Sequence, residues 1–291
     1  MLAAEGAGRE ETDAVALELR RRASAPAPAL AEGLTRSTPA TNSHVGKVEL
    51  DANVVLKEAW RLYKRLFARS VAMGAVVFGV LHLFEALTLS GRNGIIVTVL
   101  ALVLSVAGTA LLQGALVEIV RGLHRDGDDD TSVAELLGRA SGRIGRLVCV
   151  TLLTALGIGL GFLLLVVPGL ILATRWAVSV PVAVLEEGNA SDALRRSREI
   201  VRGNGWKVFQ VLFAIGALSA LVQIPFAIAA AGAGPLGWWV ATTLASALTA
   251  PYAAHALTVV YYALLEPGRP VVLEPGQNWQ SIWRQQDAAA A

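Results

Sequence analysis

The polar side chains inside the apolar parts of the chain are the first candidates for chemistry. Arg175 lies in one such stretch, His82 and Glu85 lie three residues apart in another, and Gln223 and His255 lie in a third. A charge at the centre of a bilayer costs at least about 2.5–3.5 kcal/mol, so such groups are usually functional or paired. We expect Arg175, Gln223 and His255 to line a polar or lipid-binding cavity. Interhelical hydrogen bonding is the alternative for Gln223 and His255.

His82 and Glu85 fall on one face of a helix, and this spacing could begin a metal or proton site. No third ligand is evident, and a polar rim near the membrane surface is the alternative. Arg175 could bind a lipid phosphate, pair with Glu85 or extend to the surface. The chain has four histidines and one cysteine and offers no nucleophile–base pair. We therefore expect no enzymatic activity, no metal and no cofactor.

Four aspartates at positions 126 and 128–130 resemble the start of a calcium loop. The pattern then fails, because Thr131 stands where the loop needs glycine and Leu137 where it needs glutamate. Capping of the next helix is the better interpretation, with Ser132 and Glu135 at the spacing of a capping box.

The elements that must position these groups are membrane helices. Of 291 residues 54% are hydrophobic and only 16% are charged, which disfavours a typical soluble enzyme. No Asp, Glu, Lys or Arg occurs in Gly94–Val117, Leu147–Thr174 or Val208–Leu265. A transmembrane helix needs about 20 mostly apolar residues, so these runs hold several spans. The net charge of +2 gives no reason to expect nucleic-acid binding.

Six spans fit the pattern, joined in pairs by short turns. The predicted spans are Ser70–Leu89, Gly94–Val117, Leu147–Val167, Leu170–Leu185, Val208–Ala231 and Gly237–Leu265. The predicted turns are Ser90–Asn93, Pro168-Gly169 and Gly232–Pro235, where proline and glycine favour a reversal. Within the third span, Gly157 and Gly161 have the spacing of a close-packing helix face.

A charged segment with helical amphipathicity precedes each pair of spans. These segments are Asp51–Ala68, Ser132–Arg146 and Ser191–Gly203. The fold class is therefore all-α integral membrane, with six transmembrane helices in three hairpins, each preceded by a basic amphipathic interfacial helix. We expect the apolar faces of these helices to be buried in the cytoplasmic leaflet. The candidates for contact with anionic phospholipid there are Arg195, Arg196, Arg198 and Arg202.

Orientation follows from the basic residues, since Lys and Arg accumulate in cytoplasmic loops. With both ends inside, only Arg92 and Arg175 lie on the outer side. We expect a cytoplasmic (inner) membrane protein with six spans in residues 49–266, a disordered cytoplasmic tail in 1–48 and a second tail in 267–291. A start near Val45 is an alternative for the first tail, because organised sequence begins at about Val48.

A motif resides in the central part of the chain. It comprises a Pro-Gly turn, an arginine in the next helix, a proline, an acidic residue, a serine and a Gly-x-x-Trp segment. The residues that carry it are Pro168, Gly169, Arg175, Pro181, Glu186, Ser197, Gly203 and Trp206. This resembles the bacterial membrane family named after the membrane domain of glycerophosphoryl diester phosphodiesterase. The resemblance covers about Val48–Pro267 and implies a six-span inner-membrane module in which these residues are structural. It does not imply phosphodiesterase activity.

These features favour a non-enzymatic membrane protein that organises lipid or a partner protein at the cytoplasmic membrane. The alternative is a transporter or channel for a small solute or lipid, because Pro181, Pro225 and Pro251 interrupt three spans.

Overall fold

The computed structural model describes residues 50–89, 95–126, 132–266 and 271. The described residues form helices and contain no strand. The helices are α2 (Ala52–Arg65), α3 (Phe67–Leu89), α4 (Ile95–Asp126), α5 (Val133–Ser141), α6 (Ile144–Leu164), α7 (Val166–Arg175), α8 (Ser179–Leu185), α9 (Ala190–Val201), α10 (Gly205–Ala230) and α11 (Gly234–Leu265). The predicted tail 1–48, the turn Ser90–Asn93, the aspartates at 128–130 and most of the tail 267–291 lie outside the described residues.

Six segments are long and apolar enough to cross a membrane, as the sequence predicts. They are Phe67–Ala86, Ile95–His124, Ile144–Leu164, Val166–Leu185, Gly205–Ala230 and Gly234–Leu265. The fourth segment is not one continuous helix. It consists of α7 and α8, and the backbone leaves the helical path between Trp176 and Val178.

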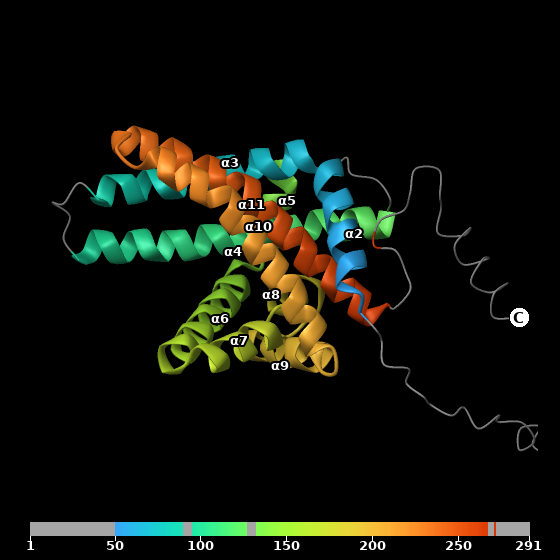
Figure 1. Cartoon of the computed structure of the whole chain (residues 1–291). Helices are drawn as coiled ribbons and strands as arrows, with labels where there is room; N and C mark the ends of the chain where they lie inside the picture. The colour runs from blue at the N-terminus through green and yellow to red at the C-terminus, as the bar shows by residue number, and fades with distance from the viewer. Residues whose placement is uncertain (1–49, 90–94, 127–131, 267–270, 272–291) are drawn as a thin grey trace, which may run out of the picture. The chain divides into compact units, whose positions relative to one another are not determined.

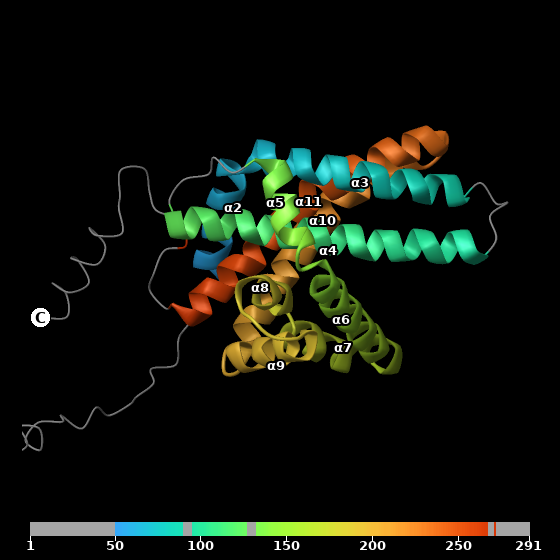
Figure 2. The same cartoon turned by 180° about the vertical axis from the view of Figure 1, so that it is seen from behind.

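Helix α11 is the central helix of the bundle. It packs against α10, with which it pairs, and also against α2, α3 and α4 (Figures 1 and 2). Small residues permit this close packing: a Cβ atom on Gly74 of α3 would lie 3.2 Å from the Cα atom of Ala247. The other two pairs of neighbours along the chain, α3 with α4 and α6 with α7, pack against each other as well.

The apolar face of α2 is buried inside the protein. Val55, Ala59 and Leu62 are at most 2% exposed, and α2 packs mainly on α11. The Tyr63 hydroxyl donates a hydrogen bond to the Leu248 carbonyl oxygen at 2.9 Å. Burial raises the pKa of Tyr63 above its usual value, so the donor stays protonated. The expectation that lipid covers this face is wrong.

The same correction applies to α9. Its apolar face, with Ala193, Ser197 and Val201 buried, packs against α8 and α6. Amphipathic spacing marks a helix that has one covered face, but it does not say whether lipid or protein covers it. In this chain, protein covers both α2 and α9.

Two helix boundaries differ from the prediction. The segment 132–146 does not form one helix, because α5 ends at Ser141 and α6 begins at Ile144 after a turn at Gly142 and Arg143. The Ser132 hydroxyl caps α5, accepting from the Glu135 N–H at 3.3 Å. The Glu135 carboxylate pairs with Arg139 at 2.7 Å, so only half of the predicted capping box forms.

The second boundary concerns the turn between the third and fourth spans. The chain reverses at Leu165, which has extended backbone angles, and not at Pro168-Gly169. Pro168 lies in the first turn of α7, where a missing N–H costs nothing because the helix has no partner for it. The predicted turn at Gly232–Pro235 is confirmed, with φ of +89° at Gly232 and +70° at Gly234.

The α6–α7 pair is closely packed along its glycine face. A Cβ atom on Gly161 would lie 2.9 Å from the Cα atom of Gly169, and one on Gly157 would collide with the Trp176 ring. The predicted role of Gly157 and Gly161 is thus confirmed, with the partner face lying in the same hairpin.

We predict that Gly157→Ala lowers the free energy of unfolding by about 1–3 kcal/mol, the usual cost of overpacking. Gly159→Ala is the matched control, because a Cβ atom there meets nothing within 4 Å. Unfolding of the purified protein in detergent measures both variants. Equal stability of the two would contradict the close contact with Trp176.

Candidate functional site

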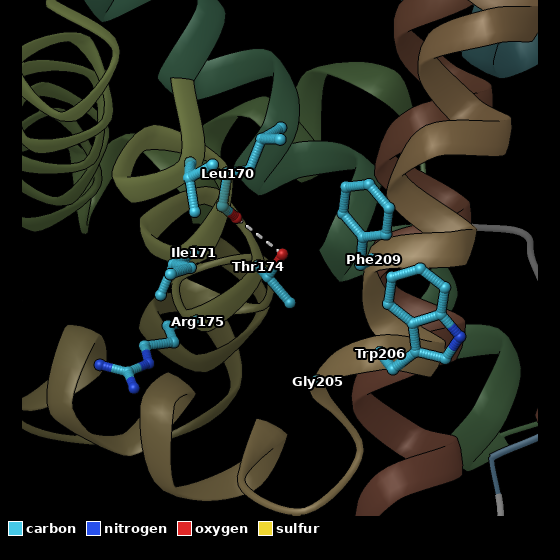
Figure 3. A pocket seen from close by; sticks show the side chains of 8 residues that line it. Leu170, Ile171, Thr174, Arg175, Gly205, Trp206 and Phe209 are labelled. Carbon is cyan, nitrogen blue, oxygen red and sulfur yellow. Dashed lines mark hydrogen bonds between the residues drawn. The ribbon is translucent and has the colours of Figure 1, made fainter. Parts of the chain in front are cut away.

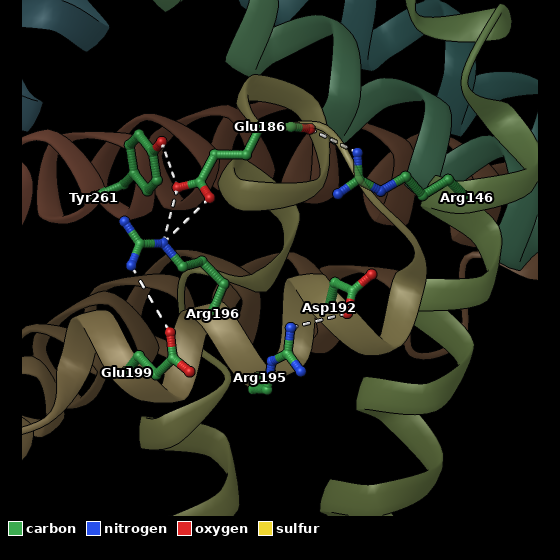
Figure 4. A network of polar contacts seen from close by, with 7 residues as sticks. All are labelled: Arg146, Glu186, Asp192, Arg195, Arg196, Glu199 and Tyr261. Atoms are coloured by element: carbon green, nitrogen blue, oxygen red, sulfur yellow. Dashed lines mark hydrogen bonds and ion pairs between the residues drawn. The ribbon is translucent and has the colours of Figure 1, made fainter.

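Glu186, the residue after α8, connects four helices. Its carboxylate accepts hydrogen bonds from the Tyr261 hydroxyl of α11 at 3.0 Å and from Arg196 Nε of α9 at 3.2 and 3.4 Å. Its backbone carbonyl accepts from Arg146 Nη1 of α6 at 2.6 Å (Figure 4). Charge-assisted hydrogen bonds of this kind are about twice as strong as neutral ones. Glu186 therefore fixes α6, α8, α9 and α11 relative to one another.

A second carboxylate, Glu118 of α4, extends this network. It is 9% exposed and pairs with Arg143 at 3.3 Å and with Arg121 at 3.4 Å. Arg143 also donates to the Val184 carbonyl, which closes the end of α8. Glu118 and Glu186 each lie near one end of a span. The turns at Leu165 and Gly232 lie at the other end of the bundle.

The prediction from sequence missed Glu118, Arg143, Arg146 and Tyr261. A signal for two of them exists in the charge pattern. Glu118 directly follows the uncharged run that ends at Val117, and Arg146 directly precedes the run that begins at Leu147. Charges that border apolar runs are held at the edge of the hydrocarbon layer, so they come to one level of a helical bundle.

A polar cavity of about 460 Å³ lies next to this network. We call it the arginine cavity; it is lined by Gly142, Arg143, Gly145, Arg146, Glu186, Glu187 and Gly188. Arg146 Nε and Nη2 are shielded from solvent and have no hydrogen-bond partner among the described residues. Buried guanidinium N–H groups without acceptors are costly, so Arg146 has unused hydrogen-bonding capacity beside the cavity.

A second cavity is a mainly apolar groove of about 350 Å³ between α7 and α10. Its lining residues are Val167, Leu170, Ile171, Thr174, Arg175, Gly205, Trp206 and Phe209. In Figure 3 the rings of Trp206 and Phe209 form one wall, and the Arg175 side chain lies at the opposite edge and points away from these rings. The Thr174 hydroxyl donates to the Leu170 carbonyl at 2.8 Å, so it adds little polarity to the groove.

The sequence-based orientation put Arg175 near the outer side and α9 on the inner side, but the structure brings the two together. The Arg175 carbonyl oxygen accepts a hydrogen bond from the Ser197 hydroxyl of α9 at 3.0 Å, and its side chain is exposed. The Glu85 carboxylate, the other partner considered for Arg175, accepts from the Ser105 hydroxyl of α4 at 3.5 Å.

Arg175, Gln223 and His255 are not brought together at one contact. Gln223 donates to the Thr249 hydroxyl at 3.4 Å, between α10 and α11. His255 is fully buried, and its Nε2 atom lies 3.0 Å from the Ser70 hydroxyl of α3. Each therefore has its own interhelical partner, which favours the alternative of structural hydrogen bonding for Gln223 and His255.

His82 contacts its own helix and α11 through its ring. The ring stacks on Phe78, and Nδ1 lies 3.4 Å from the Thr243 hydroxyl of α11. The part of the chain that the structure describes has no group of three His, Cys, Asp or Glu side chains that could hold a metal ion.

The three arginines of α9, together with Arg202 directly after it, divide into two groups. Arg196 points inward to Glu186, and Arg195 pairs along the helix with Asp192 at 3.2 Å (Figure 4). Arg198 and Arg202 are exposed. The capping of α9 holds this face in place, since the Asp192 carboxylate accepts from the Asn189 N–H at 3.1 Å.

The remaining motif residues lie at helix ends and contacts. Pro181 is buried in α8, and Gly203 has a φ of +92° in the link from α9 to α10. A left-handed backbone conformation of this kind favours glycine. Trp206 is 68% exposed in the first turn of α10.

Residues 146–262 match the family model described as the membrane domain of glycerophosphoryl diester phosphodiesterase. The resemblance inferred from the motif is confirmed over this segment. The chain is a membrane protein. The matched segment runs from the first turn of α6 to the last turn of α11, so it contains Arg146, Glu186 and Tyr261 of the network.

Two similar proteins are UPF0259 membrane proteins. The one from Pectobacterium carotovorum is 32% identical over 103 residues, which are 34% of this chain and 39% of that protein. The one from Sodalis glossinidius is 29% identical over 97 residues, which are 33% of this chain and 38% of that protein. The chain thus spans about two fifths of the length of these curated relatives. No solved structure matches the chain.

We predict that Glu186→Gln lowers the free energy of unfolding by about 1–2 kcal/mol, because Arg196 and Tyr261 lose a charged acceptor that is partly screened by solvent. Glu187→Gln is the matched control, since that neighbouring side chain is exposed. Thermal or denaturant unfolding of both variants in detergent provides the measurement. If the two variants were equally stable, Glu186 would not hold the four helices together.

Proposed function

We propose that the protein is a non-enzymatic component of the cytoplasmic membrane that binds anionic phospholipid at the inner leaflet and so organises lipid or a partner protein there. The observation that carries this proposal is the pair of exposed arginines Arg198, in α9, and Arg202, which directly follows it, because α9 packs against α7 and α7 forms one wall of the groove. A guanidinium group beside an apolar groove matches the two chemical parts of a phospholipid.

The basic face of α9 is held rigidly. Ala193 and Val201 are buried on the opposite face, and Arg196 is fixed by Glu186. Because internal packing anchors the helix, its outward arginines need no insertion of apolar side chains to reach headgroups. Each basic residue near an anionic surface contributes about 1 kcal/mol, and salt weakens this attraction.

The groove supplies the apolar half of the proposed contact. Its walls are aliphatic and aromatic side chains, and its volume of about 350 Å³ accommodates part of an acyl chain. Arg175 lies at the edge of the groove, and the Ser197 hydrogen bond holds its backbone against α9. A lipid phosphate at Arg175 would therefore also lie beside the basic helix.

The charge pattern supports an orientation in which these groups face the cell interior. The basic residues of α2, α5 and α9 all lie in segments that precede the spans, and the turns at Leu165 and Gly232 carry no charge. In this orientation both chain ends are cytoplasmic.

Transport remains a second candidate, favoured by the break between α7 and α8 in the fourth span. Broken helices form substrate sites in several transporter folds. The separate partners of Arg175, Gln223 and His255 favour lipid binding over a shared polar pathway.

We predict that the triple variant Arg175→Gln, Arg198→Gln and Arg202→Gln lowers the affinity for phosphatidylglycerol about tenfold or more, since each charge near the surface adds about 1 kcal/mol. Native mass spectrometry of the protein titrated with this lipid measures the change. The control is Arg139→Gln, which removes a charge already paired with Glu135. Unchanged affinity in the triple variant would refute the proposed contact surface.

We predict further that a cysteine at Ala134 in α5 reacts with a membrane-impermeant thiol reagent only after cells are permeabilised. A cysteine at Ala233, in the turn between α10 and α11, reacts in intact cells. Both are introduced into a Cys149→Ser background, because Cys149 is the single native cysteine. The reverse labelling pattern would invert the proposed orientation.

A further inference from the structure

The arginine cavity has a charge distribution that neither the basic face of α9 nor the apolar groove shares. Its lining combines two guanidinium groups, of Arg143 and Arg146, with two carboxylates, of Glu186 and Glu187. Two turns frame it: the α5–α6 turn at Gly142 and the α8–α9 turn at Gly188. The cavity thus presents positive and negative groups to one space.

Glycines keep this space open. A Cβ atom on Gly145 would meet nothing within 4 Å, so the position is open in front of the first turn of α6. Gly188 has a φ of +124°, which favours glycine at the opposite wall. The volume of about 460 Å³ lies within the roughly 300–1,000 Å³ that is usual for small-ligand sites.

On the cationic wall, Arg146 has N–H groups that make no hydrogen bond with the described residues. Arg146 uses Nη1 on the Glu186 carbonyl, while Nε and Nη2 have no acceptor among the described residues. The first turn of α6 adds backbone N–H groups, since its first intrahelical bond is donated by Leu147 to the Arg143 carbonyl. Guanidinium groups and a helix N-terminus together favour a phosphate group.

On the acidic wall, Glu186 is paired and Glu187 has no partner within the described part of the chain. The Glu186 carboxylate is committed to Tyr261 and Arg196. Glu187 is exposed and makes no hydrogen bond or ion pair with another described residue. A phosphate alone would bring its negative charge next to this carboxylate, whereas a cation alone would face the two arginines. A ligand with both charges satisfies both walls.

We propose that the arginine cavity binds a zwitterionic phosphodiester, with its phosphate at Arg143 and Arg146 and its ammonium at Glu187. Phosphatidylethanolamine carries this chemistry as a lipid headgroup, and glycerophosphoethanolamine carries it in solution. The site lies at the start of a span, because Arg146 is in the first turn of α6. The proposal shares with the proposed function the premise that the protein contacts phospholipid, but it uses different residues.

The test compares affinities of the full-length protein for short-chain phosphatidylethanolamine, short-chain phosphatidylglycerol, glycerophosphoethanolamine and inorganic phosphate. Native mass spectrometry in detergent provides the readout. Glu187→Gln should lower the affinity for phosphatidylethanolamine about tenfold, which corresponds to one lost charge-assisted hydrogen bond, and should leave phosphatidylglycerol binding unchanged. Gly145→Leu, which fills the cavity, should abolish the preference for phosphatidylethanolamine, whereas Gly145→Ala should retain it.

The controls separate the sources of the ligand and the two lipid sites. Binding of glycerophosphoethanolamine as tightly as the lipid would support the soluble source, and binding of the lipid alone would support the membrane source. Equal binding of inorganic phosphate and phosphatidylethanolamine, unaffected by Glu187→Gln, would overturn the proposal in favour of a simple anion site.

Since phosphatidylglycerol binding is assigned to Arg175, Arg198 and Arg202, its loss in the triple variant can be observed whether or not Glu187→Gln has an effect. A melting temperature equal to the wild type shows that each variant is folded.

Discussion

The need to pair a carboxylate at the end of an apolar helix underlies the arrangement of the second half of the chain. Glu186 follows a stretch of α8 that is almost wholly buried, so its charge requires partners within the bundle. Tyr261 and Arg196 supply them from α11 and α9, and Arg146 binds the same residue through its carbonyl. Both candidate sites depend on this pairing, because it fixes α9 beside the groove and sets one wall of the arginine cavity.

Hydropathy predicted the six spans well because the constraint on them is simple. About 20 apolar residues without charge have few alternatives to crossing a membrane. The positions of the turns were harder to predict. Pro168 and Gly169 looked like a reversal, yet the chain turns at Leu165, and the two residues serve the first turn and the close packing of α7. Proline is common both in a chain reversal and in the first turn of a helix. Only the contact between Gly161 and Gly169 shows that Pro168 and Gly169 belong to a helix here.

The sequence pattern could not predict which helices pack against one another. The apolar spacing of α2 and α9 predicted a covered face for each, but lipid and protein cover such a face equally well in terms of hydrophobicity. Likewise, Arg175 was placed by counting residues along a continuous helix. The break between α7 and α8 and the hydrogen bond from Ser197 place it beside α9 instead. The network around Glu186 was missed for the same reason, since residues 75 positions apart, such as Glu186 and Tyr261, show no joint signal in one sequence.

The arginines therefore have different roles, although all bear the same charge. Arg196 neutralises a carboxylate inside the bundle, and its attraction to an outside anion is reduced by that partner. Arg198 and Arg202 are exposed on a helix that needs no lipid to stay in place. A membrane contact made by such residues is electrostatic and reversible, because no apolar side chain must leave the protein to form it. The division of charge between packing and surface thus allows one helix to hold the bundle together and still present exposed arginines for the proposed contact with lipid headgroups.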